Sequence, residues 1–197
     1  MLSISGLEPR IVASFAIVPR ELFAMGIPGG PALGPLDAWP VPERYTLVSY
    51  MFFHSDIFHL AGNMLFLWVF GDNVEDAVGH FKFLVFYILC GIVAGLAHAA
   101  FMPSSSIPLI GASGAVAGVI AAYLMLHPMV RVWVLVFRVI PLRITALFAL
   151  GSWIATQFVM LMVPQSGPVA WWAHIGGLGA GALLIPILKS PGGGLFG

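Results

Sequence analysis

The chain has 197 residues, of which 60% are hydrophobic and 8% are charged, and its mean hydropathy is +1.01. A soluble domain usually carries about 25% charged residues because its surface faces water, so this composition excludes an ordinary soluble protein. The 8 basic and 8 acidic residues cancel and leave no basic surface for nucleic acid, and the single cysteine, Cys90, excludes an internal disulfide and a multi-cysteine metal site. We therefore predict an all-α membrane protein.

Residues 1–44 differ from the rest of the chain because they are rich in charge, proline and glycine. The apolar run 11–18 is too short to cross a bilayer and lacks the basic start and cleavage site of a signal peptide. It is typical of an amphipathic helix at the membrane interface, and the Gly- and Pro-rich stretch after it is typical of an extended loop. We predict that residues 1–44 form an extracytoplasmic N-terminal segment.

Five later segments resemble membrane-crossing helices, which need about 20 apolar residues to cross about 30 Å of hydrocarbon. These segments, which carry few or no charges, are 57–72, 83–102, 107–125, 144–163 and 168–188. The stretch 132–137 between two arginines is too short to cross and is predicted to lie at the interface. The sequence thus predicts a polytopic bundle of five transmembrane helices within a domain over residues 45–190, followed by a flexible tail over residues 191–197.

The basic residues predict the orientation of this bundle, because cytoplasmic loops carry an excess of Lys and Arg. Five of the eight gather in the connections that would share one side of the membrane: Lys82, Arg131, Arg138, Arg143 and Lys189. The other three are spread over the long segment 1–44. The loops 103–108 and 164–167 on the other side contain no Lys or Arg. We therefore predict a multi-pass protein of the cell (inner) membrane whose N-terminal segment lies outside and whose C-terminus lies inside.

Four polar side chains are predicted at one depth in the outer leaflet. Ser113 and His174 each lie a few residues inside the outer end of their segments. His59 and Asn63 are four residues apart and share one face of the first segment. Such side chains are costly in lipid unless they contact each other or water, so their convergence indicates a functional site.

Small residues would let the segments that carry Ser113 and His174 approach closely. Gly114 lies beside Ser113, and Gly177 and Gly181 share the face of His174. The imidazole would then reach the serine hydroxyl and take its proton during attack on a carbonyl group. No Asp or Glu follows Asp76, so neither segment carries an acid, and the site would be a Ser-His dyad rather than a triad.

The same residues allow other interpretations. The motif Gly-Ala-Ser-Gly by itself is typical of simple helix packing. His54, His59 and Asn63 would also suit a polar packing network or a zinc site, but no carboxylate or cysteine accompanies them at ligand spacing, so we expect no metal and no cofactor. A transporter or channel would be expected to show repeat halves and intramembrane charges near the midplane, and the sequence shows neither.

Three motifs in this order resemble the rhomboid family of intramembrane serine proteases. They are His54-Ser-Asp-Ile-Phe-His59-Leu-Ala-Gly-Asn63, Gly111-Ala-Ser113-Gly114, and Ala173-His174-Ile-Gly-Gly177 with Gly181. The resemblance covers residues 45–188 and implies a rhomboid-like helix bundle. It also implies an endopeptidase that hydrolyses peptide bonds in or next to transmembrane segments. Its partners would be transmembrane protein substrates and membrane lipids, and its site would face the extracytoplasmic side.

The resemblance also implies a role for each motif residue. Ser113 would be the nucleophile and His174 the general base. His59 and Asn63, with the backbone N–H of Ser113, would form the oxyanion hole, and His54 would help to hold the loop ahead of the first segment. The supporting residues would be His54, Gly111, Gly114, Gly177 and Gly181.

Three departures from the family pattern stand out. A helix expected before the long first loop is missing, which keeps open the alternative of a catalytically impaired rhomboid-like protein that binds transmembrane helices. Tyr45 and Thr46 occupy the places where many members carry a Trp-Arg pair. Ala117 replaces the aromatic residue that often stacks on the catalytic histidine, so the imidazole would have to be oriented by other contacts.

Overall fold

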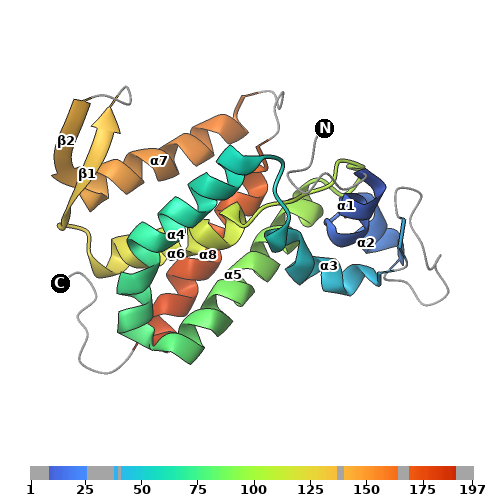
Figure 1. The fold of residues 1–197 in the computed structure, drawn as a ribbon, viewed down its shortest axis with the longest axis horizontal. Coiled ribbons are helices and arrows are strands. Elements are labelled where there is room, and N and C mark those ends of the chain that lie inside the picture. The colour runs from blue at the N-terminus through green and yellow to red at the C-terminus, as the bar shows by residue number, and fades with distance from the viewer. Residues whose placement is uncertain (1–8, 26–37, 40, 137–139, 164–168, 190–197) are drawn as a thin grey trace.

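The computed structural model describes residues 9–25, 38–39, 41–136, 140–163 and 169–189 (Figure 1). The described chain is mostly helical, as the all-α prediction requires. Its elements are α1 (Pro9–Phe15), α2 (Pro19–Met25), α3 (Glu43–Ser49), the 3-10 helix η1 (Tyr50–Phe52), α4 (Ile57–Val78), α5 (His80–Phe101), α6 (Ser113–Leu126), β1 (Arg131–Val136), β2 (Ile140–Thr145), α7 (Ala146–Leu161) and α8 (Trp171–Leu188). The predicted tail 191–197 lies outside the described residues.

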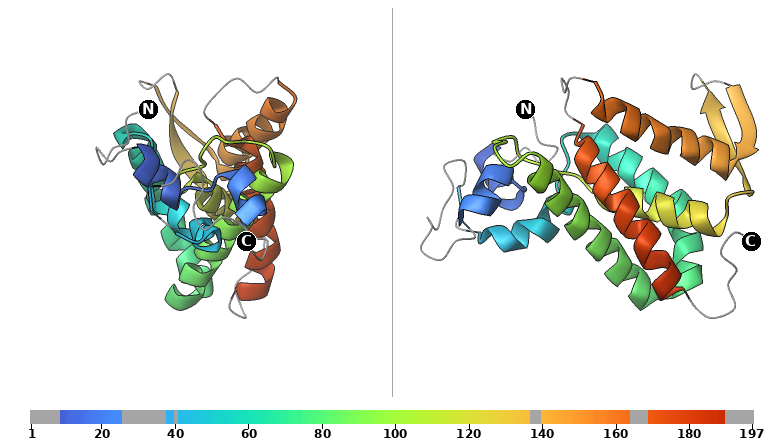
Figure 2. Two further views of the ribbon diagram at one scale, coloured as in Figure 1. Left: turned by 90° about the vertical axis from the view of Figure 1, so that its right-hand side faces the viewer. Right: turned by 180° about the vertical axis from the view of Figure 1, so that it is seen from behind.

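Helix α6 lies at the centre of the bundle and contacts α4, α5, α7 and α8. It is apolar around its whole circumference, and most of its residues are buried, which is typical of a core helix rather than a surface one. Helices α5 and α8 lie side by side against it, and the view from behind shows both in front of α6 (Figure 2). The central helix is therefore held from several sides, and its first residue is Ser113.

Glycines bring α6 and α8 into backbone contact, as the small-residue spacing predicts. A β-carbon at Gly177 would collide with the carbonyl oxygen of Gly114, and one at Gly181 would collide with the carbonyl oxygen of Gly118. Gly114 and Gly118 also allow α5 to pack closely against α6. A β-carbon at Gly114 would collide with Ala94 of α5, and one at Gly118 would collide with Cys90. Three helices thus meet at distances that no larger residue would permit.

This contact predicts a position-specific effect on stability within α8. Gly177→Ala is expected to lower the free energy of unfolding by about 1–3 kcal/mol or more, the usual cost of overpacking, because the new methyl group meets backbone. Gly179→Ala is the matched control, since nothing lies within 4 Å of a β-carbon there. Both substitutions gain the same helix propensity. The difference between their melting temperatures in detergent therefore measures the effect of the backbone contact at Gly177. Equal melting temperatures would contradict the prediction.

The predicted spans correspond to the long helices in part. Among the described residues, two helices are long and apolar enough to cross a membrane, namely α5 and α8. Helix α4 extends beyond the predicted 57–72, whereas α6 and α7 have 14 and 16 residues. The prediction of helix from residue 107 is wrong, because Leu109 pairs with Ile17 through two backbone hydrogen bonds and holds this stretch extended. The predicted span 144–163 begins with strand, and its helix starts only at Ala146.

The connection between α6 and α7 forms an antiparallel hairpin, β1 and β2, at the left-hand end of the molecule in Figure 1. The interpretation of 132–137 as a short interfacial segment missed the pairing of 131–136 with 140–145, in which Trp133 lies opposite Arg143. Val132 and Val134 are half-buried, whereas Trp133 is exposed. This alternation is the period of a strand with one covered face.

The N-terminal segment forms two short helices, α1 and α2, which lie with α3 at the right-hand end of the molecule (Figure 1). The predicted helix over 11–18 is confirmed only over residues 11–15, and a second helix follows that the prediction did not include. The chain leaves the helix after Phe15, and Ala16, Ile17 and Val18 are buried, Ile17 against Tyr50 and Leu109. Pro19 then starts α2, a position that suits proline. Most of the predicted extended loop, residues 26–37 and 40, lies outside the described residues.

Candidate active site

Ser113 is the first residue of α6, at the end of the extended stretch that pairs with Ile17. The prediction placed it a few residues inside a longer helix, and the later start of α6 corrects this. Gly111 turns the chain into the helix with a positive φ of 118°, a conformation that favours glycine. Its N–H donates to the carbonyl oxygen of Tyr50 and ties the turn to η1. Because Ser113 opens the helix, its backbone N–H belongs to the first turn, whose donors have no partner within the helix.

His174 lies in the first turn of α8, and its Nε2 is 2.9 Å from Oγ of Ser113. This is a hydrogen-bond distance, and it is the spacing that a serine nucleophile and its general base would need. The imidazole is 8% exposed. The backbone contact at Gly177, one turn further along α8, explains how a short serine side chain can reach the ring. The structure thus brings together the two residues that the sequence singled out as a dyad.

Gln157 is a third member of this hydrogen-bonded group, and the sequence analysis missed it. Its Oε1 lies 2.7 Å from Nδ1 of His174, and the residue is 2% exposed on α7. The prediction of a dyad rests on the absence of Asp and Glu, but a neutral amide oxygen also accepts a hydrogen bond from a histidine. The available signal was a lone amide in a helix whose other polar side chains are the hydroxyls of Ser152 and Thr156.

The rings of two tryptophans pack against the imidazole of His174. The ring centroid of Trp153 on α7 is 5.9 Å from that of His174, and the ring of Trp171 on α8 meets it edge-on at 6.1 Å. These distances are typical of packed aromatic pairs. The imidazole therefore has aromatic neighbours even though Ala117 provides no ring one turn after Ser113.

A cavity of about 270 Å³ adjoins Ser113, and its polar lining comes from α4. His59 and Asn63 line it together with Ser113, so these three predicted residues share one space; Phe58, Phe66 and Trp153 are among its apolar walls. Asn63 is 6% exposed, and its buried Nδ2 has no hydrogen-bond partner among the described residues. A buried donor without a partner costs free energy, so this group is available to an acceptor that enters the cavity.

Gly111 makes room for the imidazole of His59 near Ser113. A β-carbon at Gly111 would lie 2.6–2.8 Å from Cε1 and Nε2 of that ring, which is too close for any other residue. On its other side the ring contacts Ser55, whose Oγ is 3.2 Å from Nδ1. The ring edge that carries Nε2 is therefore directed towards the turn that precedes Ser113.

Asp56 holds the beginning of α4 and with it the position of His59. Its Oδ1 accepts hydrogen bonds from the backbone N–H groups of Phe58 and His59, both at 2.9 Å, in the manner of an N-cap. The hydrogen bond from the His59 N–H, followed by that from the Ser55 hydroxyl, holds the pKa of the Asp56 carboxyl below its ordinary value. The carboxylate therefore stays ionised and keeps the helix start in place.

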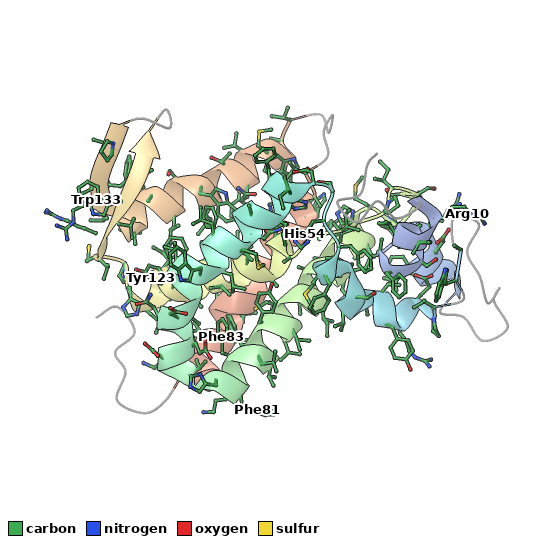
Figure 3. All side chains as sticks on the ribbon, viewed as in Figure 1. Arg10, His54, Phe81, Phe83, Tyr123 and Trp133 are labelled. Atoms are coloured by element: carbon green, nitrogen blue, oxygen red, sulfur yellow. The ribbon has the colours of Figure 1, made fainter. Side chains whose placement is uncertain are left out.

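His54 connects the segment ahead of α4 to the turn that precedes Ser113. Its Nε2 accepts the backbone N–H of Ala112 at 3.4 Å, and its ring meets that of His59 edge-on with centroids 5.1 Å apart. Burial, and then the proximity of His59, lowers the pKa of His54 below its ordinary value, so the ring is neutral near pH 7 and Nε2 can accept. Figure 3 shows His54 near the middle of the molecule, between α4 and the N-terminal helices.

Comparisons with known proteins point to one family. The family model of the Rhomboid domain matches residues 41–191. The chain is 33% identical over 155 residues to rhomboid protease GluP of Bacillus subtilis, covering 79% of this chain and 28% of that protein. It is 27% identical over 165 residues to the mitochondrial RHOMBOID-like protein 12 of Arabidopsis thaliana, covering 75% and 47%, and 28% identical over 147 residues to the mitochondrial rhomboid protein 1 of Saccharomyces cerevisiae, covering 73% and 41%. The chain thus spans less than half the length of these relatives.

Proposed function

The chain belongs to the rhomboid family of integral membrane proteins, and from this premise we propose that it is an intramembrane serine endopeptidase. It hydrolyses peptide bonds in or next to transmembrane segments of other membrane proteins. The observation that carries this proposal is the 2.9 Å contact between Oγ of Ser113 and Nε2 of His174. The unpartnered Nδ2 of Asn63 in the adjoining cavity supports it.

The reaction follows from these positions. Nε2 of His174 accepts the proton of Ser113 as Oγ attacks the substrate carbonyl carbon and forms a tetrahedral oxyanion. The protonated imidazole then gives this proton to the departing amine, the C–N bond breaks, and an acyl ester remains on Ser113. Water then attacks the ester, and His174 accepts a proton from that water. When His174 passes this proton to Oγ of Ser113, the acid leaves and the serine hydroxyl is restored.

The oxyanion would be held by donors from two helices. Nδ2 of Asn63 and the imidazole of His59 reach the cavity from α4, and the backbone N–H of Ser113 belongs to the first turn of α6. The positive end of the α6 helix dipole lies at the same point and favours negative charge there. The later start of α6 thus suits this chemistry better than the predicted burial of Ser113 within the helix.

The membrane arrangement that we propose has five spans, with the site on the extracytoplasmic side of the cell (inner) membrane. Helices α5 and α8 support it by their length and apolar character. Ser113 begins α6 and the hairpin with Arg131 and Arg143 follows its other end, so nucleophile and basic residues lie at opposite ends of the bundle. In this arrangement residues 1–44 precede a membrane domain over 45–190 and a tail over 191–197.

A serine-directed probe tests the proposal. We expect a fluorophosphonate to form one covalent adduct on folded protein in membranes, and peptide mass spectrometry to place that adduct on Ser113. A hydroxyl without a base beside it does not react in this way, so the adduct reports the dyad itself. An adduct on another residue, or none on protein shown to be folded, would contradict the proposal and favour a helix-binding protein without catalysis.

A further inference from the structure

We propose that Gln157 is a positioning residue that keeps the proton of neutral His174 on Nδ1, so that Nε2 faces Ser113 as an acceptor. The inference rests on the proposed function, since it assigns the group that prepares the base of that reaction. It stands on the hydrogen bonds of two buried side chains, Gln157 on α7 and His174 on α8.

The orientation of the Gln157 amide follows from its second hydrogen bond. Its Nε2 donates to the carbonyl oxygen of Trp153, one turn earlier in α7, at 3.0 Å. If the amide were turned over, its oxygen would face that carbonyl oxygen, and two acceptors would oppose each other. The amide nitrogen therefore belongs with Trp153, and Oε1 is the atom that lies 2.7 Å from Nδ1 of His174.

This orientation decides where the imidazole carries its proton. Oε1 only accepts, so Nδ1 of His174 must be the donor in their hydrogen bond. A neutral imidazole has one N–H, so Nε2 carries the lone pair, and Ser113 donates to it at 2.9 Å. The resulting chain of donation runs from Ser113 to His174, to Gln157 and to the carbonyl oxygen of Trp153, and each bond polarises the next.

A neutral amide suits this place better than an acid would. A carboxylate buried among apolar helices carries a large desolvation cost, whereas an amide oxygen accepts the same hydrogen bond without charge. No Asp or Glu follows Asp76 in the sequence, so α7 and α8 hold no alternative carboxylate for this role. When His174 becomes protonated during attack, Nδ1–H remains bonded to Oε1, and the ring keeps its orientation for the return of the proton.

Two substitutions with different acceptor capacity test the assignment. Gln157→Met keeps the size of the side chain and removes the acceptor. We expect it to lower kcat for a membrane-embedded substrate about 10- to 100-fold and to leave KM unchanged. This is a large part of the usual contribution of a general base. Gln157→Glu keeps an oxygen that accepts from Nδ1–H and should restore much of kcat. Thr156→Val is the control, because Thr156 is the exposed neighbour on α7 and bonds only within its own helix. If Gln157 had only a structural role, the Glu and Met variants would have the same kcat whenever their melting temperatures are equal.

The tautomer can be read directly on unmodified protein. Nitrogen-15 NMR of histidine-labelled protein, with the His174 signal assigned by its absence in His174→Ala, should show Nδ1 protonated and Nε2 unprotonated at neutral pH. The opposite tautomer overturns the inference even if Gln157→Met fails to fold, and so does a Met variant with the kcat of the unmodified protein. Failure of the proposed function is a separate result, because it appears as the absence of a Ser113 adduct on unmodified folded protein.

Discussion

Ser113→Ala and His174→Ala are each expected to abolish cleavage of a membrane-embedded substrate. The loss should be roughly 10⁶-fold in kcat, as is typical when a nucleophile or its base is removed from a serine hydrolase. The physical reason is the 2.9 Å contact, because the hydroxyl attacks only when Nε2 takes its proton. The measurement is turnover in liposomes, together with fluorophosphonate labelling of each variant.

Two further variants sharpen this prediction. Because the two residues act as one unit, the double variant Ser113→Ala with His174→Ala should lose no more than either single variant. Ser152→Ala is the control for a serine that donates to its own helix on the exposed face of α7, and it should cleave normally. Residual cleavage in Ser113→Ala at more than a trace would remove this residue as the nucleophile.

Asn63→Leu is expected to lower kcat by about 10²- to 10³-fold, which is about 2.7–4 kcal/mol of transition-state stabilisation for one oxyanion donor. The protein should at the same time be as stable as before or more stable. Nδ2 of Asn63 is buried and has no hydrogen-bond partner in the part of the chain that the structure describes, so a leucine relieves the cost of an unsatisfied donor. The leucine also removes the contact that forms in the transition state. A loss of activity with an unchanged or raised melting temperature distinguishes this role from structural support.

The same substitution elsewhere on α4 provides the control. Asn73 lies on the same helix but is exposed, so Asn73→Leu should leave kcat unchanged. An Asn63→Leu variant that cleaves within a few-fold of the unmodified protein would show that Nδ2 does not reach the oxyanion. A variant that loses activity only together with its fold would assign Asn63 to packing instead.

Much of this protein could be predicted from the sequence because the relevant information is local. Composition excludes a soluble fold, since 8% charged residues cannot cover a surface that faces water. The apolar runs that became α5 and α8 are continuous and long, so their helical form needs no partner to be recognised. The spacing of Gly177 and Gly181 indicates close helix packing for the same reason, because positions on one helix face follow from the helical period alone.

The features that were predicted wrongly depend on how one segment of the chain pairs with another. The start of α6 at Ser113 is decided by Ile17, whose backbone pairs with Leu109 and keeps the preceding residues extended although they are apolar. The strand β1 needs β2 as its partner, and neither would be stable as a strand by itself. Local propensity carries no information about such pairings.

The sequence by itself determined that this chain is a helical membrane protein with Ser113, His174, His59 and Asn63 in family motifs, because composition, period and motif order are properties of the letters. Only the tertiary structure decided that Ser113 opens its helix, that Asn63 and His59 line one cavity with it, and that Gln157 is the partner of His174. A hydrogen bond between α7 and α8 depends on how two helices are rotated and spaced against each other. The rotation and spacing of α7 against α8 are set by packing across the whole bundle, so the sequence of either helix alone does not determine them.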